Sequence, residues 1–181
     1  MAKPRLLVGD LHERHTGLTA ALGGTFFEAA CVCFSRHHES PVDVEIVRKE
    51  GSAVREFAFD PPDERERNAH ANEIDATEAG AYGVSLAAVE AVESLVAVRR
   101  AETLSGADWY VAPVGAASDD LEACYRLEVS GTDTGTLSVV ETRLSQKVQQ
   151  TRAGKCNLPA IASVVGFKQR VVAIRKVDDS L

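Results

Sequence analysis

The sequence lacks the long apolar runs, paired cysteine motifs and internal repeats that would define several classes of protein. No apolar stretch approaches the roughly 20 residues needed to span a bilayer, and the first ten residues, MAKPRLLVGD, have no long apolar core of the signal-peptide type. The four cysteines are scattered and form no CxxC motif, which favours free thiols in a reducing compartment. We therefore expect a cytoplasmic protein that does not enter a membrane.

The length and composition indicate one globular domain. With 181 residues, of which 45% are hydrophobic and 26% charged, the chain can form one well-cored domain but is too short for two domains of ordinary size. We expect residues 1–181 to form a single domain with an N-terminal extension and hairpin over 1–70 and a core over 71–181.

Charge is distributed unevenly along the chain. The net charge of −7 argues against a nucleic-acid partner, because phosphate contacts supply most of the affinity of DNA-binding proteins. The segment from Thr136 to Val177, however, has eight Lys and Arg residues against the single acid Glu141, so it carries +7 and leaves −14 for the rest. This basic segment favours a nucleic-acid partner, although a solvated helix face followed by an edge strand gives the same pattern.

Apolar periodicity predicts an α/β fold with a mixed sheet. Gly23–Gly24 would end one helix and Thr25 would cap the next, whereas period-two alternation across Gly51–Ser52 indicates a hairpin. A long helix is expected before the last third of the chain, either continuous or with a break near Gly80 or Gly83. The expected elements are strand 3–10, helices 12–24 and 26–38, strands 42–50 and 53–60, helix 63–106, strands 107–113 and 121–131, helix 134–154, and strands 160–167 and 170–177.

Two acidic residues lie in or beside apolar strands in the second half of the chain. Asp108 is near the start of ADWYVAP, and Glu128 lies within the apolar run CYRLEVSG, where a carboxylate is costly unless a metal or another partner compensates it. Two carboxylates from adjacent strands, with the Val129 carbonyl, suit Mg²⁺ or Mn²⁺. The alternatives are a turn acid at Asp108 and a solvent-facing strand position at Glu128.

Four blocks of sequence carry a resemblance to a known superfamily. They are RRAETLSGADWY (99–110), RLEVSGT (126–132), R-x3-K-x2-Q (143–150) and LPAIASVVGF (158–167), and they look like blocks of uncharacterised bacterial proteins within or near the PD-(D/E)XK, or restriction-endonuclease-like, nucleases. The resemblance covers roughly the last 110 residues. It implies an α-β-β-β-α-β core in which Asp108 and Glu128 hold Mg²⁺ or Mn²⁺. The superfamily lysine that helps to activate water is replaced here by Ser130, which predicts weakened or lost activity.

A lysine on the following helix is a candidate replacement. Arg143, Lys147 and Gln150 fall at i, i+4 and i+7 and therefore share a helix face. Lys147 is the predicted substitute for the missing lysine, and the alternative is that it only extends along the helix edge. The resemblance also makes Glu78, on the preceding helix, a candidate for the extra acid that some superfamily members place there.

The expected function is a metal-dependent nuclease acting on nucleic-acid phosphodiesters, in a context of bacterial defence or DNA processing that the resemblance implies. The alternative is a catalytically inactive nuclease-fold protein that serves as an interaction or scaffold subunit, as a homo-oligomer or with a protein partner. The candidate catalytic residues are Asp108, Glu128, Lys147, Ser130 and Glu78, the candidate metal ligands are Asp108 and Glu128, and the candidate nucleic-acid-binding residues are Arg143, Gln150, Arg152 and Lys155.

Two other groups of residues could bind metals. Asp10 and His12 match the D-x-H opening of calcineurin-like metallophosphoesterases, but the GDxxD and GNH blocks of that pattern do not follow. The segment from Cys31 to His38 contains two cysteines and two histidines, which could be ligands of zinc. Cys31 and Cys33 lie about 200° apart on a helix, so buried cysteines are the commoner explanation.

Overall fold

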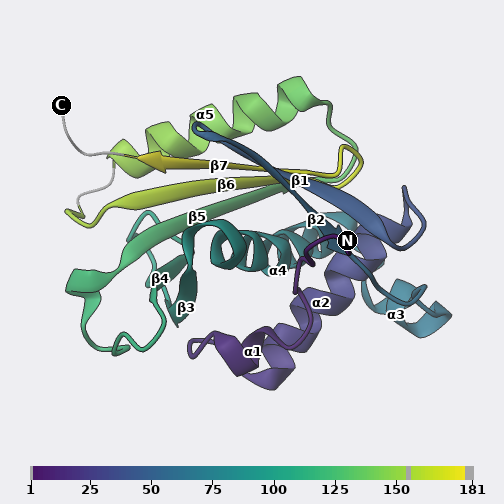
Figure 1. Ribbon diagram of the computed structural model, residues 1–181, viewed down its shortest axis with the longest axis horizontal. Helices are drawn as coiled ribbons and strands as arrows, with labels where there is room; N and C mark the ends of the chain where they lie inside the picture. Colours follow the sequence, from purple (N-terminus) through teal and green to yellow (C-terminus); the bar gives the residue numbers. More distant parts are fainter. Residues whose placement is uncertain (1, 154–155, 178–181) are drawn as a thin grey trace.

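The computed structural model describes residues 2–153 and 156–177, which form a seven-stranded mixed sheet with helices on both faces (Figure 1). The strand order is β2-β1-β7-β6-β5-β4-β3. The elements are α1 (Leu11–Arg14), α2 (Ala20–Ser35), β1 (Val42–Arg48), β2 (Gly51–Phe57), α3 (Glu64–Ala69), α4 (Glu73–Glu93), β3 (Leu95–Arg100), β4 (Trp109–Pro113), a 3₁₀ turn η1 (Leu121–Ala123), β5 (Tyr125–Thr132), α5 (Leu137–Ala153), β6 (Ala160–Gly166) and β7 (Val171–Val177).

The sheet combines parallel and antiparallel pairs. The hairpin β1–β2, the meander β3–β4–β5 and the pair β6–β7 are antiparallel, while β5–β6 and β1–β7 are parallel. The predicted mixed α/β class is confirmed, and so is the predicted antiparallel pairing of the two strands that follow Asp108 and contain Glu128.

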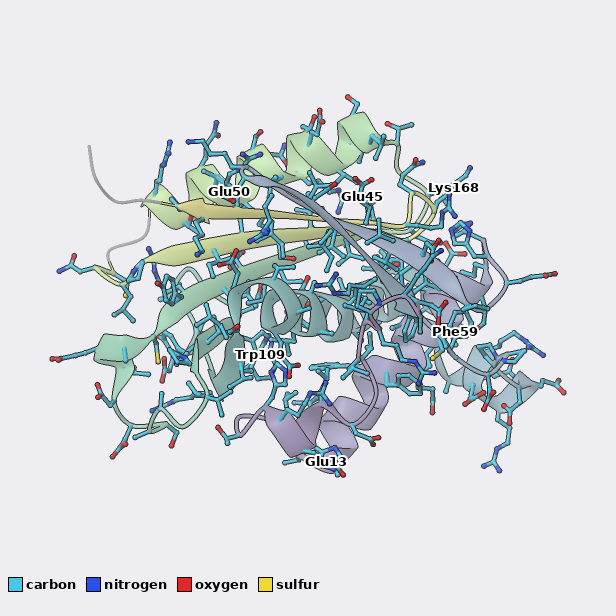
Figure 2. The ribbon with its side chains drawn as sticks, in the orientation of Figure 1. Glu13, Glu45, Glu50, Phe59, Trp109 and Lys168 are labelled. Atoms are coloured by element: carbon cyan, nitrogen blue, oxygen red, sulfur yellow. The ribbon has the colours of Figure 1, made fainter. Side chains whose placement is uncertain are left out.

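Different helices cover the two faces of the sheet. Helices α2 and α4 pack over one face and α5 over the other (Figure 1). The side chains of β6 alternate accordingly: Ile161 and Val165 join the larger core with α4, and Ala162 and Val164 join the smaller core under α5. Trp109, at the start of β4, is fully buried in the larger core and points toward the helical layer (Figure 2).

The helix predicted over 63–106 is wrong in two places. Asp63 and Asn72 each cap a separate helix, α3 and α4, because their side chains accept hydrogen bonds from the first-turn amides. Helix α4 ends at Ser94, which has the left-handed φ of 57°. The chain then forms β3, where branched Val96 and Val98 fit a buried strand that pairs with β4.

Gly80 and Gly83 lie within α4 and do not break it. They allow close packing of α4 against its neighbours. A Cβ at Gly80 would approach Phe167 to 3.0 Å and one at Gly83 would approach the Phe26 side chain to 3.0 Å. The two glycines therefore let α4 lie close to α2 and to Phe167, which follows β6.

The N-terminal predictions are also corrected. Residues 3–10 form no strand beyond a bridge between Arg5 and Glu56, and α2 continues through Gly23–Gly24 with Thr19, not Thr25, as its N-cap. Gly23 is buried and lies close to His12, whereas Gly24 is exposed, and α2 continues through both in spite of the low helix propensity of glycine. Backbone hydrogen bonds at Leu6 cover the outer edge of β2, and those at Gly17 cover the outer edge of β3.

A buried polar contact fixes the N-terminal segment to α4. The Ala97 amide donates to Nδ1 of fully buried His15 at 2.8 Å, so Nε2 carries the ring proton and donates to Glu90 at 3.0 Å. Arg14 donates to the other carboxylate oxygen of Glu90 at 2.8 Å. Burial on its own opposes ionisation of Glu90, but the hydrogen bonds from His15 and Arg14 outweigh it and lower the pKa of Glu90 from 4.5.

Candidate functional site at the open edge of β5

The candidate site lies where β4 begins, so that part of β5 has no strand partner on its β4 side. The pairing of β4 with β5 starts at Trp109 opposite Leu127, but β5 continues to Thr132. A cavity of about 480 Å³ opens at this unpaired edge between α4 and α5. Its lining residues are Glu73, Ile74, Thr77, Glu78, Ala81, Tyr82, Asp108, Val129, Ser130, Gly131, Thr132, Asp133, Arg143 and Lys147.

Asp108 takes the place of a strand residue at this edge. Its backbone amide donates to the Leu127 carbonyl at 2.8 Å, and its Oδ2 accepts a hydrogen bond from the Val129 amide at 2.8 Å. The Asp108 carboxylate thus accepts a hydrogen bond from the Val129 N–H, which a longer β4 would have paired with a backbone carbonyl. The other oxygen, Oδ1, remains directed at α4, where it accepts from the Tyr82 hydroxyl at 3.0 Å.

Tyr82 joins Asp108 to a second acid. Its hydroxyl oxygen lies 2.9 Å from Oε1 of Glu78 and 3.0 Å from Oδ1 of Asp108. The hydroxyl has one proton and can satisfy only one carboxylate at a time. Burial raises the pKa of Tyr82, so this proton is retained at neutral pH. Because each carboxylate oxygen is about 3 Å from the hydroxyl, the two oxygens are no more than about 6 Å apart.

Arg100, on β3, is the fourth member of this group of side chains, which we call the Tyr82 cluster (Glu78, Tyr82, Arg100 and Asp108). Its guanidinium lies over the rings of Tyr82 and Trp109, at 4.7 and 5.0 Å from their centroids. Its Nη2 donates to the Tyr82 hydroxyl at 3.1 Å and lies 3.8 Å from Oδ1 of Asp108. Neither Tyr82 nor Arg100 was among the site residues predicted from the sequence. The position of Tyr82 four residues after Glu78 on one helix was the available signal.

Glu128 faces the other side of the sheet and pairs with α5. Its neighbours Leu127 and Val129 enter the larger core under α4, so period-two alternation turns Glu128 toward α5. There its Oε1 lies 2.5 Å from Nζ of Lys147, and only 13% of the Glu128 side chain is exposed. The lysine proposed to replace the missing one therefore contacts the predicted acid, but that acid is held away from the Tyr82 cluster.

Arg143 lies one turn before Lys147 on α5 and binds the same strand. Its Nη1 donates to the Gly131 carbonyl at 2.7 Å and to the Ser130 hydroxyl at 3.4 Å. Arg143 thus satisfies an acceptor on β5, as Asp108 satisfies a donor. The remaining predicted nucleic-acid-binding residues lie elsewhere: Gln150 is exposed on α5, Arg152 lines a different groove, and Lys155 lies outside the described residues.

The donor chemistry of the site fits a hard divalent cation. Glu78 and Asp108 offer carboxylate oxygens from opposite sides of one hydroxyl proton, and oxygen ligands of this type suit Mg²⁺ or Mn²⁺. Residues 2–153 and 156–177 contain no compact group of three or more His, Cys, Asp or Glu side chains. Water, substrate oxygens and backbone carbonyls would therefore supply the other ligands of such an ion, as is usual for Mg²⁺.

The other two metal patterns are not assembled as the sequence suggested. Asp10 precedes the single turn α1 with a left-handed φ of 52°, and no described metal-binding group includes it. Burial raises the pKa of both Cys31 and Cys33 to about 12, which keeps these thiols protonated. His37 contacts Asp133 at 2.9 Å and His38 donates to the Phe167 carbonyl at 3.1 Å, so each histidine has a partner other than a cysteine.

Comparison of the chain with protein-family models, curated proteins and solved structures gives no match. Within the part of the chain that the structure describes, no helix is long and apolar enough to cross a membrane.

Proposed function

We propose that the protein is a metal-dependent, nuclease-like enzyme whose active site is the cavity at the open edge of β5. The observation that carries this proposal is that Glu78, Asp108 and Lys147 line one cavity and that Lys147 binds Glu128. The order α4, β3, β4, β5, α5, β6 supports the proposal, because it is the α-β-β-β-α-β order that the resemblance implies. We propose the restriction-endonuclease-like fold as the finer description of residues 73–166.

The side chains have distinct roles in this proposal. Mg²⁺ or Mn²⁺, held by Asp108 and Glu78, would polarise the phosphoryl oxygen and acidify the attacking water. Glu128, on the α5 side of the sheet, would position Lys147. Lys147 would supply the positive charge that Ser130 lacks and donate from Nζ to a phosphate oxygen as negative charge develops there. Tyr82 would keep its proton and bridge the two carboxylates when no metal is bound.

The test is cleavage of plasmid and single-stranded DNA with Mn²⁺ by variants that preserve the fold. Asp108→Asn keeps an oxygen that can accept from the Val129 amide but removes the charge, and Glu128→Gln does the same beside Lys147. Both should lose cleavage by at least about a hundredfold. Asp119→Asn, in an exposed loop, is the matched control and should retain activity. Unchanged cleavage in both site variants would exclude a hydrolase at this cavity.

A second candidate function is that of an inactive nuclease-fold scaffold. One observation favours it: Lys147 already pairs with Glu128 and Arg100 lies beside Asp108, so cationic side chains neutralise both predicted ligands. A scaffold would show no cleavage in any divalent metal, and Mn²⁺ would leave its melting temperature unchanged.

A further inference from the structure

A second groove, of about 860 Å³, lies on the opposite flank of α5 from the candidate site. It runs between α5, the β1–β2 turn that carries Glu50 (Figure 2) and the end of β7. The groove is lined by Arg48, Lys49, Glu50, Glu93, Glu141, Leu144, Ser145, Val148, Gln149, Arg152, Ile174, Arg175 and Lys176.

The groove forms where β1 and β7 stop pairing, just as the first cavity forms where β4 and β5 stop pairing. The pairing of β1 with β7 covers only Glu45–Val47 and Val171–Ala173, whereas β7 continues to Val177. Beyond Ala173 the β1 side of β7 opens into the groove. Backbone groups of this edge could contact a ligand, and backbone N–H groups are common phosphate donors in nucleic-acid complexes.

The groove is basic although the chain as a whole is acidic. Five cationic side chains line it against three acids, in a protein of net charge −7. Glu93, whose side chain is 8% exposed, pairs with both Arg48 and Lys176 and is therefore already compensated. Glu50 and Glu141 are the acids left to offset the other three cations, Lys49, Arg152 and Arg175.

One donor in the groove lacks an acceptor. Nη1 of Arg48 contacts the Val92 carbonyl at 3.3 Å and Glu93 at 3.4 Å, but its Nε is buried and has no hydrogen-bond partner among the described residues. Because this Nε is shielded from the groove, it is the surplus of positive charge that indicates a ligand with negatively charged oxygens.

Helix α5 is a ridge between the two hollows. Arg143 and Lys147 lie on the flank beside the first cavity and Arg152 on the flank beside the groove. The exposed face between them carries the neutral glutamines Gln146 and Gln150. A helix is about 10–12 Å across, so a polyanion could cross it between the two hollows without meeting a row of acids.

We propose that the groove binds the phosphate backbone of a single-stranded nucleic acid that crosses α5 from the first cavity. The proposal rests on the proposed function for the contact at the first cavity, whereas the groove itself is argued from its own charges. Duplex DNA has a persistence length of about 150 base pairs and cannot bend over one helix, but a single strand can. The charges on both flanks of α5 therefore suit one flexible strand.

The test is binding of a fluorescein-labelled single strand of about 20 nucleotides, as DNA and as RNA, followed by fluorescence anisotropy in EDTA. The double variant Arg152→Glu and Arg175→Glu should weaken binding about tenfold or more and reduce the slope of log K against log salt concentration by about 1.4, since each contact to a single strand contributes about 0.7. Arg152→Gln with Arg175→Gln should act in the same direction and guards against misfolding caused by charge reversal.

The matched control is Arg55→Glu with Arg65→Glu, which makes the same change in net charge away from both hollows. It should retain the wild-type salt slope with at least one of the two single strands. Equal weakening by the two charge-reversal variants, no binding of either strand by the wild type, or an equal loss for a duplex would overturn the proposal. Binding is measured in EDTA and therefore without metal-dependent cleavage. If Asp108→Asn cleaved DNA as well as the wild type, the proposed function would be refuted, but the binding result would be unaffected.

Discussion

Replacing Tyr82 with Phe tests whether Glu78 and Asp108 form a cation-binding pair. The substitution removes the hydroxyl that lies 2.9 Å from Glu78 and 3.0 Å from Asp108 and leaves the packed ring in place. In the absence of metal, the two carboxylates then face each other without a shared proton. We expect the variant to be less stable than the wild type in EDTA and to bind Mn²⁺ more tightly.

The expected magnitude follows from the contacts of the hydroxyl. A hydrogen bond to a charged group contributes about 1.5–3 kcal/mol. Glu78 is exposed, so solvent screens its share and the lower end, about 1.5 kcal/mol, applies. For a chain of this length that loss corresponds to a fall in melting temperature of about 3–6 °C. Mn²⁺ at about 100 times its Kd would stabilise either protein by about 2.7 kcal/mol, and more for the variant at equal concentration if its Kd is lower.

The assay is thermal unfolding of wild type and variant in EDTA and in a series of Mn²⁺ concentrations. The difference in melting temperature should narrow as Mn²⁺ rises. Tyr110→Phe is the matched control, because that hydroxyl contacts Glu102 at 3.1 Å outside the cavity. Its difference from the wild type should not depend on Mn²⁺. A Tyr82→Phe difference that stays constant across the series would refute the assignment of Glu78 and Asp108 as a metal pair.

Further substitutions, in the active-site proposal and in the fold, have defined outcomes. Lys147→Met should reduce Mn²⁺-dependent cleavage by at least about a hundredfold while Lys147→Arg retains part of it, as measured with plasmid DNA. Gly131→Val should destabilise the protein by about 1–3 kcal/mol in urea denaturation, because its Cβ would lie 2.9 Å from Cβ of Ala81, whereas Gly24→Ala meets nothing within 4 Å and should not destabilise it. Glu90, with its lowered pKa, contributes stability that is present above its ordinary pKa of 4.5 and is lost as the pH falls toward its lower folded value. The stability difference between Glu90→Gln and the wild type should therefore shrink as the pH is lowered below 4.5, and a constant difference would contradict that role.

Much of the sheet could be predicted because its strands have clear local signals. Period-two alternation located β1 and β2, and short apolar runs located β4 to β7. Strand β3 was missed because Leu95–Arg100 follows a long helix without a Gly or Pro between them. The left-handed Ser94 ends that helix, and pairing with β4 stabilises the strand. Both depend on tertiary contacts that no local pattern encodes.

The candidate site could be predicted only in part for the same reason. The spacing of Arg143 and Lys147 correctly predicted that both side chains share one face of α5, and both contact β5. The contact between Glu78 and Asp108 through Tyr82 depends on how closely α4 docks against β5, which the sequence does not display. The pairing of Glu128 with Lys147 depends on which face of the sheet α5 covers.

The open edge of β5 also determines how mutations at the site must be interpreted. Strand β4 has five residues and β5 has eight, so the longer strand needs other partners for its backbone groups. Asp108 accepts from the Val129 amide and Arg143 donates to the Gly131 carbonyl, and both contacts stabilise the strand whether or not the cavity is catalytic. Truncation of Asp108 to Ala would remove that support together with the charge, so a loss of activity would have two causes. The amide in Asp108→Asn retains the acceptor, and a loss of activity in that variant, with unchanged unfolding in EDTA, would be due to the missing charge.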